Sequence, residues 1–294
     1  MAAPDIVLPI APPLLDVSPA GFAAAIEADT IGTRVLGSDL PVTAHRDGDA
    51  DWVTGVPLDP YTNTVASVRF EEATADERIA AIVAAYDAVP APFLWWRAPF
   101  HGPADLGERL ERARVFPIDD HVPAMAMDLA RLGRPPARPD GLEIRGVRDE
   151  AGARDYYGIL AAEPPERGAP SQWPPDKLEG VIARVRERLP LEPAPLRAVG
   201  YLHGEPVATA RVSLAGGAAG IYAVATLPEA RGRGIGAALT HAVMATGRDL
   251  GYRVATLQSS SMGYRIYERL GFQHVFDYAL HLHLPGGARY EPGS

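Results

Sequence analysis

Residues 223–243, AVATLPEARGRGIGAALTHAV, carry the strongest structural signal in this 294-residue chain. It joins an apolar run, a turn spaced Arg231-x-x-Gly234-x-Gly236, and a segment whose apolar positions recur with the period of an α-helix. We therefore expect a strand, a glycine-rich turn and a helix in that order. The first amides of a helix have no intrahelical acceptor, and glycine lets a ligand approach the backbone closely. The turn is thus typical of an anion site suited to a pyrophosphate.

Two better-known phosphate motifs do not match this turn. A dinucleotide fingerprint requires Gly-x-Gly-x-x-Gly and an acid about 20 residues further on, and a Walker loop requires Gly-Lys-Ser/Thr. The alternative without a ligand is a strand-to-helix turn whose glycines serve only tight packing. The coincidence of Pro228, two arginines and three glycines favours a ligand site.

The segments on either side of the turn extend the pattern into an α/β fold with a mixed sheet flanked by helices. Strands are expected at 142–147, 196–201, 206–214, 218–226, 254–258 and 276–284. Helices are expected at 149–162, 177–189, 234–250 and 262–270, the first beginning at a capping Asp149.

Two motifs in this half resemble the signatures of the GNAT superfamily of acyl-CoA-dependent N-acyltransferases. They are PEARGRGIG at 228–236 and YERLGF at 267–272, and they stand in the order and spacing of that family. The resemblance covers about residues 142–284. It implies a GNAT-like fold and an enzyme that moves an acetyl or other short acyl group from acyl-CoA to a small-molecule amine.

The resemblance also implies roles for individual residues. The amide of Val224 would stabilise the tetrahedral oxyanion, and Tyr267 would protonate the departing thiolate as general acid. A tyrosine that only packs in the core is the alternative for Tyr267. The positions expected to contact the cofactor are Val224, Thr226, Arg231, Gly232, Arg233, Gly234, Ile235, Gly236, Ser260 and Tyr267.

The chain departs from the family at its general base. Many members carry a glutamate on the strand before the turn, whereas Gly220 stands four residues before Val224 and no Asp, Glu or His occurs in 212–224. The base is then water, is unnecessary for a neutral amine, or is one of three candidates, of which Glu163 is our assignment. The three are Glu163, Glu166 and Tyr222.

Two further positions near the expected site have alternative interpretations. Ser260 stands where the family often has an asparagine that contacts the cofactor arm, and serine is a shorter hydrogen-bonding replacement. Trp173 lies in a loop that shapes the acceptor pocket in family members, so it is either a wall of that pocket or a hydrophobic plug.

The first half repeats the helix and strand order of the second. Helix 74–89 with a capping box at Thr74, strand 92–99, helix 105–113 and strand 124–129 mirror the last four elements of the second half. We expect tandem GNAT-like domains: a degenerate one at 1–131, a Pro-rich linker at 132–141, and the acyltransferase domain at 142–294. The acidic turn RFEEATAD at 69–76 would repel a pyrophosphate, so we expect no coenzyme A there. Coincidental α/β alternation is the alternative.

The charge divides with the proposed domains. The chain carries 28 basic and 37 acidic residues, net −9, of which −10 falls in residues 1–140 and +1 in the remainder. This balance argues against nucleic acid or an anionic membrane as partner, but not against coenzyme A. Cysteine is absent, which agrees with direct transfer without a covalent intermediate, and we expect a cytoplasmic protein, monomeric or homodimeric.

The sequence also fits other functions. The missing strand carboxylate is compatible with a non-catalytic acyl-CoA sensor or interaction module, and the same pocket could serve O-acylation or decarboxylation. No metal is expected, because His281 and His283 share one strand face without a third ligand. We interpret both as solvent-facing histidines.

Overall fold

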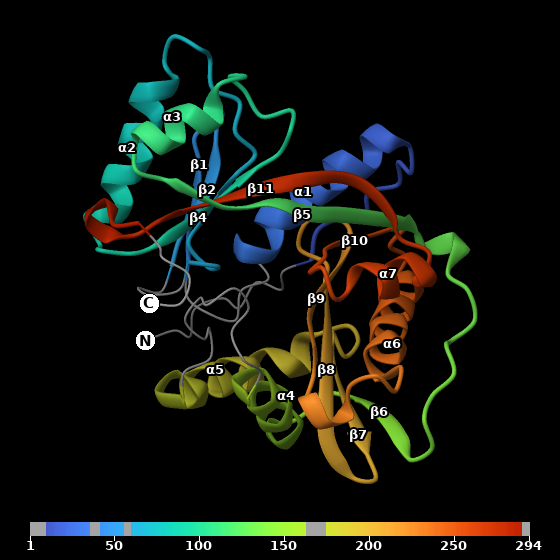
Figure 1. Ribbon diagram of the computed structural model, residues 1–294. Helices are drawn as coiled ribbons and strands as arrows, with labels where there is room; N and C mark the ends of the chain where they lie inside the picture. The colour runs from blue at the N-terminus through green and yellow to red at the C-terminus, as the bar shows by residue number, and fades with distance from the viewer. Residues whose placement is uncertain (1–9, 36–41, 56–59, 163–174, 290–294) are drawn as a thin grey trace.

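The structure, a computed structural model, describes residues 10–35, 42–55, 60–162 and 175–289 (Figure 1). The helices are α1 (Pro19–Val35), α2 (Ala75–Asp87), α3 (Leu106–Arg112), α4 (Glu150–Ala162), α5 (Pro175–Arg188), α6 (Ile235–Asp249) and α7 (Tyr264–Leu270). The strands are β1 (Thr43–Arg46), β2 (Asp51–Thr54), β3 (Thr64–Ala66), β4 (Phe93–Arg97), β5 (Phe116–Asp128), β6 (Leu142–Gly146), β7 (Arg197–Leu202), β8 (Glu205–Ser213), β9 (Ala219–Thr226), β10 (Val254–Gln258) and β11 (Gln273–His283).

All of these strands form one mixed sheet in the order β1-β2-β3-β4-β11-β5-β10-β9-β8-β7-β6. The neighbours β3 and β4 are parallel, as are β9 and β10, and the other pairs are antiparallel. The expected α/β class with a mixed sheet is therefore confirmed.

The two halves of the sheet are built alike. In each, an antiparallel series, β1-β2-β3 or β7-β8-β9, ends in a strand that a helix connects to its parallel neighbour. That helix is α2 in the first half and α6 in the second, and a short helix, α3 or α7, then leads to a last strand. The repeat expected from the sequence is thus confirmed in the fold.

The last strands of the two repeats are exchanged, which the sequence did not reveal. The strand β5 ends the first repeat but pairs with β10 of the second, while β11 pairs with β4 of the first. The same two strands pair with each other and run side by side through the centre of the molecule (Figure 1). Because the sheet is continuous across both halves, the boundaries at 131 and 142 stay a prediction. The intervening residues 132–139 form no helix or strand.

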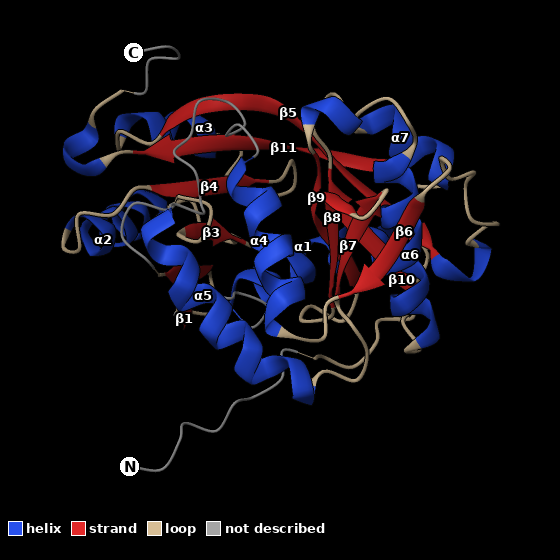
Figure 2. Ribbon diagram, turned by 90° about the horizontal axis from the view of Figure 1, so that it is seen from below, coloured by secondary structure: helices blue, strands red, loops and turns tan. Residues whose placement is uncertain are grey.

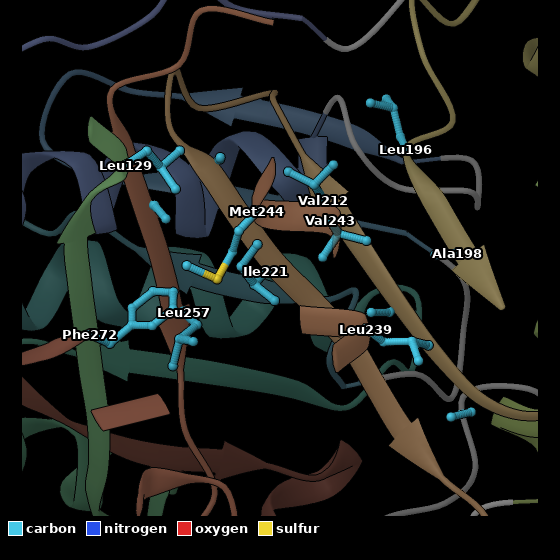
Figure 3. Packing of buried hydrophobic residues seen from close by; sticks show 14 of the residues in the cluster. Leu129, Leu196, Ala198, Val212, Ile221, Leu239, Val243, Met244, Leu257 and Phe272 are labelled. Carbon is cyan, nitrogen blue, oxygen red and sulfur yellow. The ribbon is translucent and has the colours of Figure 1, made fainter. Parts of the chain in front are cut away.

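Helices cover both faces of the second half of the sheet. Alternate side chains of a strand point to opposite faces, and on β7 Ala198 packs into the cluster under α6, whereas Val199 packs into the cluster under α4 and α5. Figure 2 shows α4 and α5 on one side of β7, β8 and β9, with α6 on the other. Figure 3 shows Leu239, Val243 and Met244 of α6 against the strands.

Helix α1 occupies the centre of the molecule on the face opposite α6. Phe22 and Ile26 join a core cluster that contains Tyr278 of β11 and Ala218. The segment before α1 reaches into the second half, where the Ala11 amide donates to the Leu214 carbonyl at 3.0 Å. The first helix of the chain is therefore held by strands of both repeats.

Of the two helix caps expected from the sequence, the structure confirms one. Asp149 caps α4 through its carboxylate, which accepts from the Gly152 amide at 2.8 Å. The capping box at Thr74 is wrong, because the Thr74 hydroxyl donates to the Glu71 carbonyl at 3.4 Å and makes no cap bond. That hydroxyl turns back toward the preceding turn and away from the helix amides.

The histidine pair on β11 corrects another expectation. His281 and His283 are 2% and 1% exposed, not solvent-facing, because β11 lies between β4 and β5 with both faces covered. His283 is held by the Asp87 carboxylate at 3.0 Å and the Arg114 carbonyl at 3.1 Å. Burial lowers the pKa of His281 to about 4, so its ring is neutral at physiological pH.

Candidate active site

The strand β9 leaves its neighbour β10 after a short parallel contact. The pairing joins Ala219 with Ala255 and Gly220 with Thr256, and in the described chain β10 makes no further pair with β9. The strand continues to Thr226, and its side chains change from buried to half-buried at Tyr222. This part of β9 presents backbone hydrogen-bonding groups on an open edge, where an extended ligand can pair with the strand.

A β-bulge distorts β9 along this open edge. Between the pairs Thr209–Ala225 and Arg211–Tyr222, β9 contains one residue more than β8. The extra residue, Ala223, adopts φ +50°, an unfavourable backbone conformation for alanine. Thr209 Oγ1 donates a hydrogen bond of 2.8 Å to the Ala223 carbonyl and so holds the bulge. A bulge re-aims the residue after it, and here that residue is Val224, from which we expect the oxyanion contact.

The glycine turn leads directly from β9 into α6. Gly232 and Gly234 have φ +74° and +79°, values that favour glycine over every residue with a side chain. Gly234 is the N-cap of α6, and no side chain caps it. The first turn of α6 begins with Ile235 and Gly236. Its amides therefore lie at the positive end of the helix dipole and have no intrahelical acceptor. This arrangement fits a pyrophosphate.

Two side chains border the start of α6. A Cβ on Gly236 would lie 3.5 Å from Thr226 Oγ1, an ordinary contact, so neither backbone conformation nor crowding by the protein requires glycine there. Arg231 Nε donates to the Thr226 carbonyl at 2.9 Å, which places its guanidinium over the end of β9. Arg233 is exposed in the same turn. The site thus has a small-residue helix start and two cations beside it.

Helix α7 carries the expected general acid. Tyr267 packs against the same core cluster as Val224, and its ring meets Phe272 edge-on with centroids 6.0 Å apart. A Cβ on Gly263 would lie 2.7 Å from the ring, so this glycine makes room for Tyr267. Ser260 turns toward the start of α7, where its hydroxyl accepts from the Gly263 amide at 3.3 Å.

The other face of β9 holds a buried carboxylate that the sequence did not point out. Asp29 of α1 is 0% exposed and accepts hydrogen bonds from the hydroxyls of Tyr222 at 2.6 Å, Thr256 at 2.8 Å and Thr33 at 2.9 Å. Burial raises the pKa of Asp29 to about 6, and the three donors and Arg34 act against that rise. The available signal was its place on the apolar face of the helix, seven residues after Phe22.

Among the three candidate bases, only Tyr222 lies in the described chain. Burial and the neighbouring Asp29 charge raise its pKa well above 10, so Tyr222 is a phenol at neutral pH. Glu163 and Glu166, like Trp173 of the expected acceptor pocket, lie outside the described residues. The assignment of Glu163 stays a prediction.

The described residues lack two features that would indicate another kind of protein. They contain no group of three or more His, Asp or Glu side chains arranged to hold a metal ion. In the same ranges, no helix combines the length and the apolar composition needed to cross a membrane.

The family comparison matches a part of the second half of the chain. Residues 197–274, which run from the start of β7 into β11, match the model of the Acetyltransferase (GNAT) domain. This range contains the bulged strand, the glycine turn and Tyr267. These residues therefore correspond to a GNAT acetyltransferase domain, and the class of enzyme that such a domain defines is an acyltransferase.

Solved structures extend the likeness to both halves. A GCN5-related N-acetyltransferase from Kribbella flavida matches with a TM-score of 0.65 and 20% identity over 90% of this chain and 96% of its own. One from Sphaerobacter thermophilus matches with a TM-score of 0.58 and 18% identity over 92% and 94%. A tandem GNAT protein from the clavulanic acid biosynthesis pathway has a TM-score of 0.58 at 12% identity over 96% and 99%. The fold of the whole chain is thus that of a tandem GNAT protein.

Proposed function

We propose that the protein is an N-acyltransferase that moves an acetyl group from acetyl-CoA to a small-molecule amine by direct attack. The observation that carries this proposal is the continuity of three features: the open edge of β9, its bulge before Val224, and the uncapped start of α6. Together they offer successive backbone donors to an extended thioester that ends in a pyrophosphate.

The residues of the chain divide the work along that path. The first amides of α6, with Arg231 and Arg233, bind the pyrophosphate of the cosubstrate. The backbone of β9 holds the pantetheine arm, and the Val224 amide donates to the thioester carbonyl as its oxygen gains charge. The Tyr267 hydroxyl gives a proton to the departing sulfur. The amine attacks the thioester carbon itself, which agrees with the absence of a cysteine to carry the acyl group.

The acceptor amine approaches from the face of β9 that α1 and α4 flank. Gly220 faces α1 through Asp29, while Ala223 and Ala225 pack toward the cluster under α4. These positions carry small side chains or none. The opposite face is covered by α6.

The test is release of coenzyme A thiol from acetyl-CoA with a panel of small amines, followed by mass measurement of the product. A mass increase that matches replacement of a hydrogen by an acetyl group on an amine nitrogen supports the proposal. Tight binding of acetyl-CoA without thiol release with any amine contradicts it and favours a non-catalytic sensor. Acetyl on oxygen, or loss of carbon dioxide from a malonyl thioester, assigns the pocket to other chemistry.

A further inference from the structure

The place of the missing strand carboxylate is filled from another part of the chain. A Cβ on Gly220 would overlap both carboxylate oxygens of Asp29, which belongs to α1 of the first repeat. The carboxylate therefore lies directly over the strand position from which a side-chain base would project. Tyr222, two residues along β9 and on the same face, donates its hydroxyl proton to Asp29 at 2.6 Å.

Close backbone contacts hold α1 in this position. A Cβ on Gly32 would lie 2.7 Å from the Cα of Gly216, and a Cβ on Gly216 would overlap the Cα of Asp29. The helix thus touches the turn after β8 with backbone against backbone. Such packing leaves little freedom for a shift of α1, so the position of the carboxylate is fixed by the fold.

The hydrogen bonds around Asp29 leave Tyr222 a defined role. Thr256 and Thr33 each donate to the carboxylate, and the Thr33 oxygen lies 2.7 Å from Ser213 Oγ. These two hydroxyls are buried, and the Tyr222 hydroxyl is buried against Asp29 while the residue as a whole is half-buried at the point where β9 opens. Among the donors to Asp29, Tyr222 is the one that belongs to β9 itself.

We propose that Tyr222 receives the proton of the attacking amine while it passes its own phenol proton to Asp29, so that the first repeat supplies the base that β9 of the second repeat lacks. This inference rests on the proposed acyl transfer. In this scheme Tyr222 is the catalytic residue and Asp29 is a positioning residue that acts through it.

The step balances in bonds and protons. The bond from the amine nitrogen to the carbonyl carbon forms, and the bond from that carbon to sulfur breaks. The nitrogen proton goes to the Tyr222 oxygen as the phenol proton goes to Asp29 Oδ2. The Tyr267 hydroxyl protonates the sulfur, and solvent restores the proton of Tyr267 and removes that of Asp29 after product leaves.

The charged and titratable groups around Asp29 agree with this role. Its pKa of about 6 lets it be ionised at neutral pH and still accept a proton during turnover. Arg34 on α1 is the cation that favours the ionised form of Asp29. Tyr222 on β9 faces the Asp29 carboxylate directly. Tyr278 on β11 lies nearby and stays protonated, since burial raises its pKa.

The experiment compares Asp29→Asn and Tyr222→Phe with the wild-type chain, using acetyl-CoA and one accepted amine across pH 5–9. Each variant should lose about 100-fold in kcat, and the double variant should lose no more than either single one, because the two residues act in series. The rise of wild-type kcat through pH 6 should disappear in Asp29→Asn. The same amine serves in all measurements, so its own titration cancels.

Tyr278→Phe is the matched control for a lost buried phenol. The Tyr278 hydroxyl lies 3.4 Å from Thr30 Oγ1 of the same helix and makes no bond to Asp29. This variant should keep both kcat and the pH profile, and acetyl-CoA affinity should stay within about twofold in every variant.

The results distinguish failure of the proton transfer through Tyr222 from failure of the proposed acyl transfer. If the wild type turns over and Asp29→Asn and Tyr222→Phe keep its kcat and pH profile, the inference is overturned and the proposed function stands. Equal losses in Tyr278→Phe also overturn it, since they show a structural effect of α1. An absence of wild-type turnover with every amine, despite acetyl-CoA binding, overturns the proposed function together with the inference.

Discussion

The carboxylate of Asp29 lies against the Cα of Gly220, 191 positions later in the chain, in the space that a side chain at 220 would occupy. Gly220 has an ordinary backbone conformation, because it is absent from the residues with positive φ. Glycine is therefore required at this position because α1 packs closely against it, and not because of the backbone conformation of β9. The two repeats meet at this contact.

Substitution of Gly220 by alanine should destabilise the protein. The new Cβ would overlap the Asp29 carboxylate, so α1 must shift, and overpacking of this kind costs about 1–3 kcal/mol. Urea unfolding measures the change. The matched control is Gly158→Ala in α4, where a Cβ meets no atom within 4 Å and should add about 0.5–1 kcal/mol of stability. Equal effects of the two substitutions would contradict the proposed close packing.

The stability of the protein should depend on pH through Asp29. Burial raises its pKa from 3.8 to about 6, so the folded state binds the proton more tightly than the unfolded state. The contribution of Asp29 is therefore most favourable below pH 4 and falls as the pH rises to 6. A shift of two pKa units corresponds to about 3 kcal/mol.

The measurement for this pH dependence is the free energy of unfolding of wild type minus that of Asp29→Asn, at several pH values between 4 and 7. The difference should fall toward neutral pH, because asparagine does not titrate. If the difference in the free energy of unfolding rises or stays constant over this range, the pKa of Asp29 is not raised in the folded state.

The sequence identified the second repeat better than the first for a physical reason. The glycine turn and α6 have strong local signals, since positive φ requires glycine and the apolar face repeats over four turns. The strands β1, β2 and β3 have only four, four and three residues, too few to show a periodic pattern. They form because the neighbouring strands supply the partners.

The exchange of β5 and β11 could not be predicted from local patterns. A strand was expected at 124–129, which covers only the C-terminal end of β5, whereas the strand runs over Phe116–Asp128 and contains prolines at 117 and 123. Its length reflects pairing with both β11 and β10. The position of Asp29 is likewise a tertiary property, because periodicity shows that it is on the buried face but not which strand it meets.

Gly234→Glu should abolish acetyl-CoA binding. The glutamate would place a negative charge at the start of α6, where the proposed pyrophosphate binds, and would add bulk at φ +79°. Gly251→Glu at the other end of α6 is the control, since it has φ +92°, open space around it and the same added charge. Isothermal titration with acetyl-CoA should show full affinity for the control alone. Loss of affinity in both would indicate general unfolding.

Tyr267→Phe should lower kcat by roughly 100-fold and leave the acetyl-CoA dissociation constant nearly unchanged. The ring keeps its edge-on contact with Phe272, so only the hydroxyl that we propose as proton donor to the sulfur is lost. Steady-state thiol release and titration calorimetry separate the two quantities. A cosubstrate with a better leaving thiol should reduce the defect. Unchanged kcat would remove the assignment of Tyr267 as general acid.

Thr209→Val should impair catalysis through the backbone of β9. The substitution preserves the shape of the side chain but removes the hydrogen bond to the Ala223 carbonyl, which holds that residue at φ +50°. Relaxation of the bulge would turn the Val224 amide away from the thioester oxygen. Because loss of a whole oxyanion donor costs about 100-fold or more, partial misalignment should lower kcat by roughly tenfold. Thr246→Val in α6 loses a comparable hydroxyl bond, to Ala242, far from the bulge, and should leave kcat unchanged. If both variants retain wild-type kcat, the bulge does not set the position of the Val224 amide.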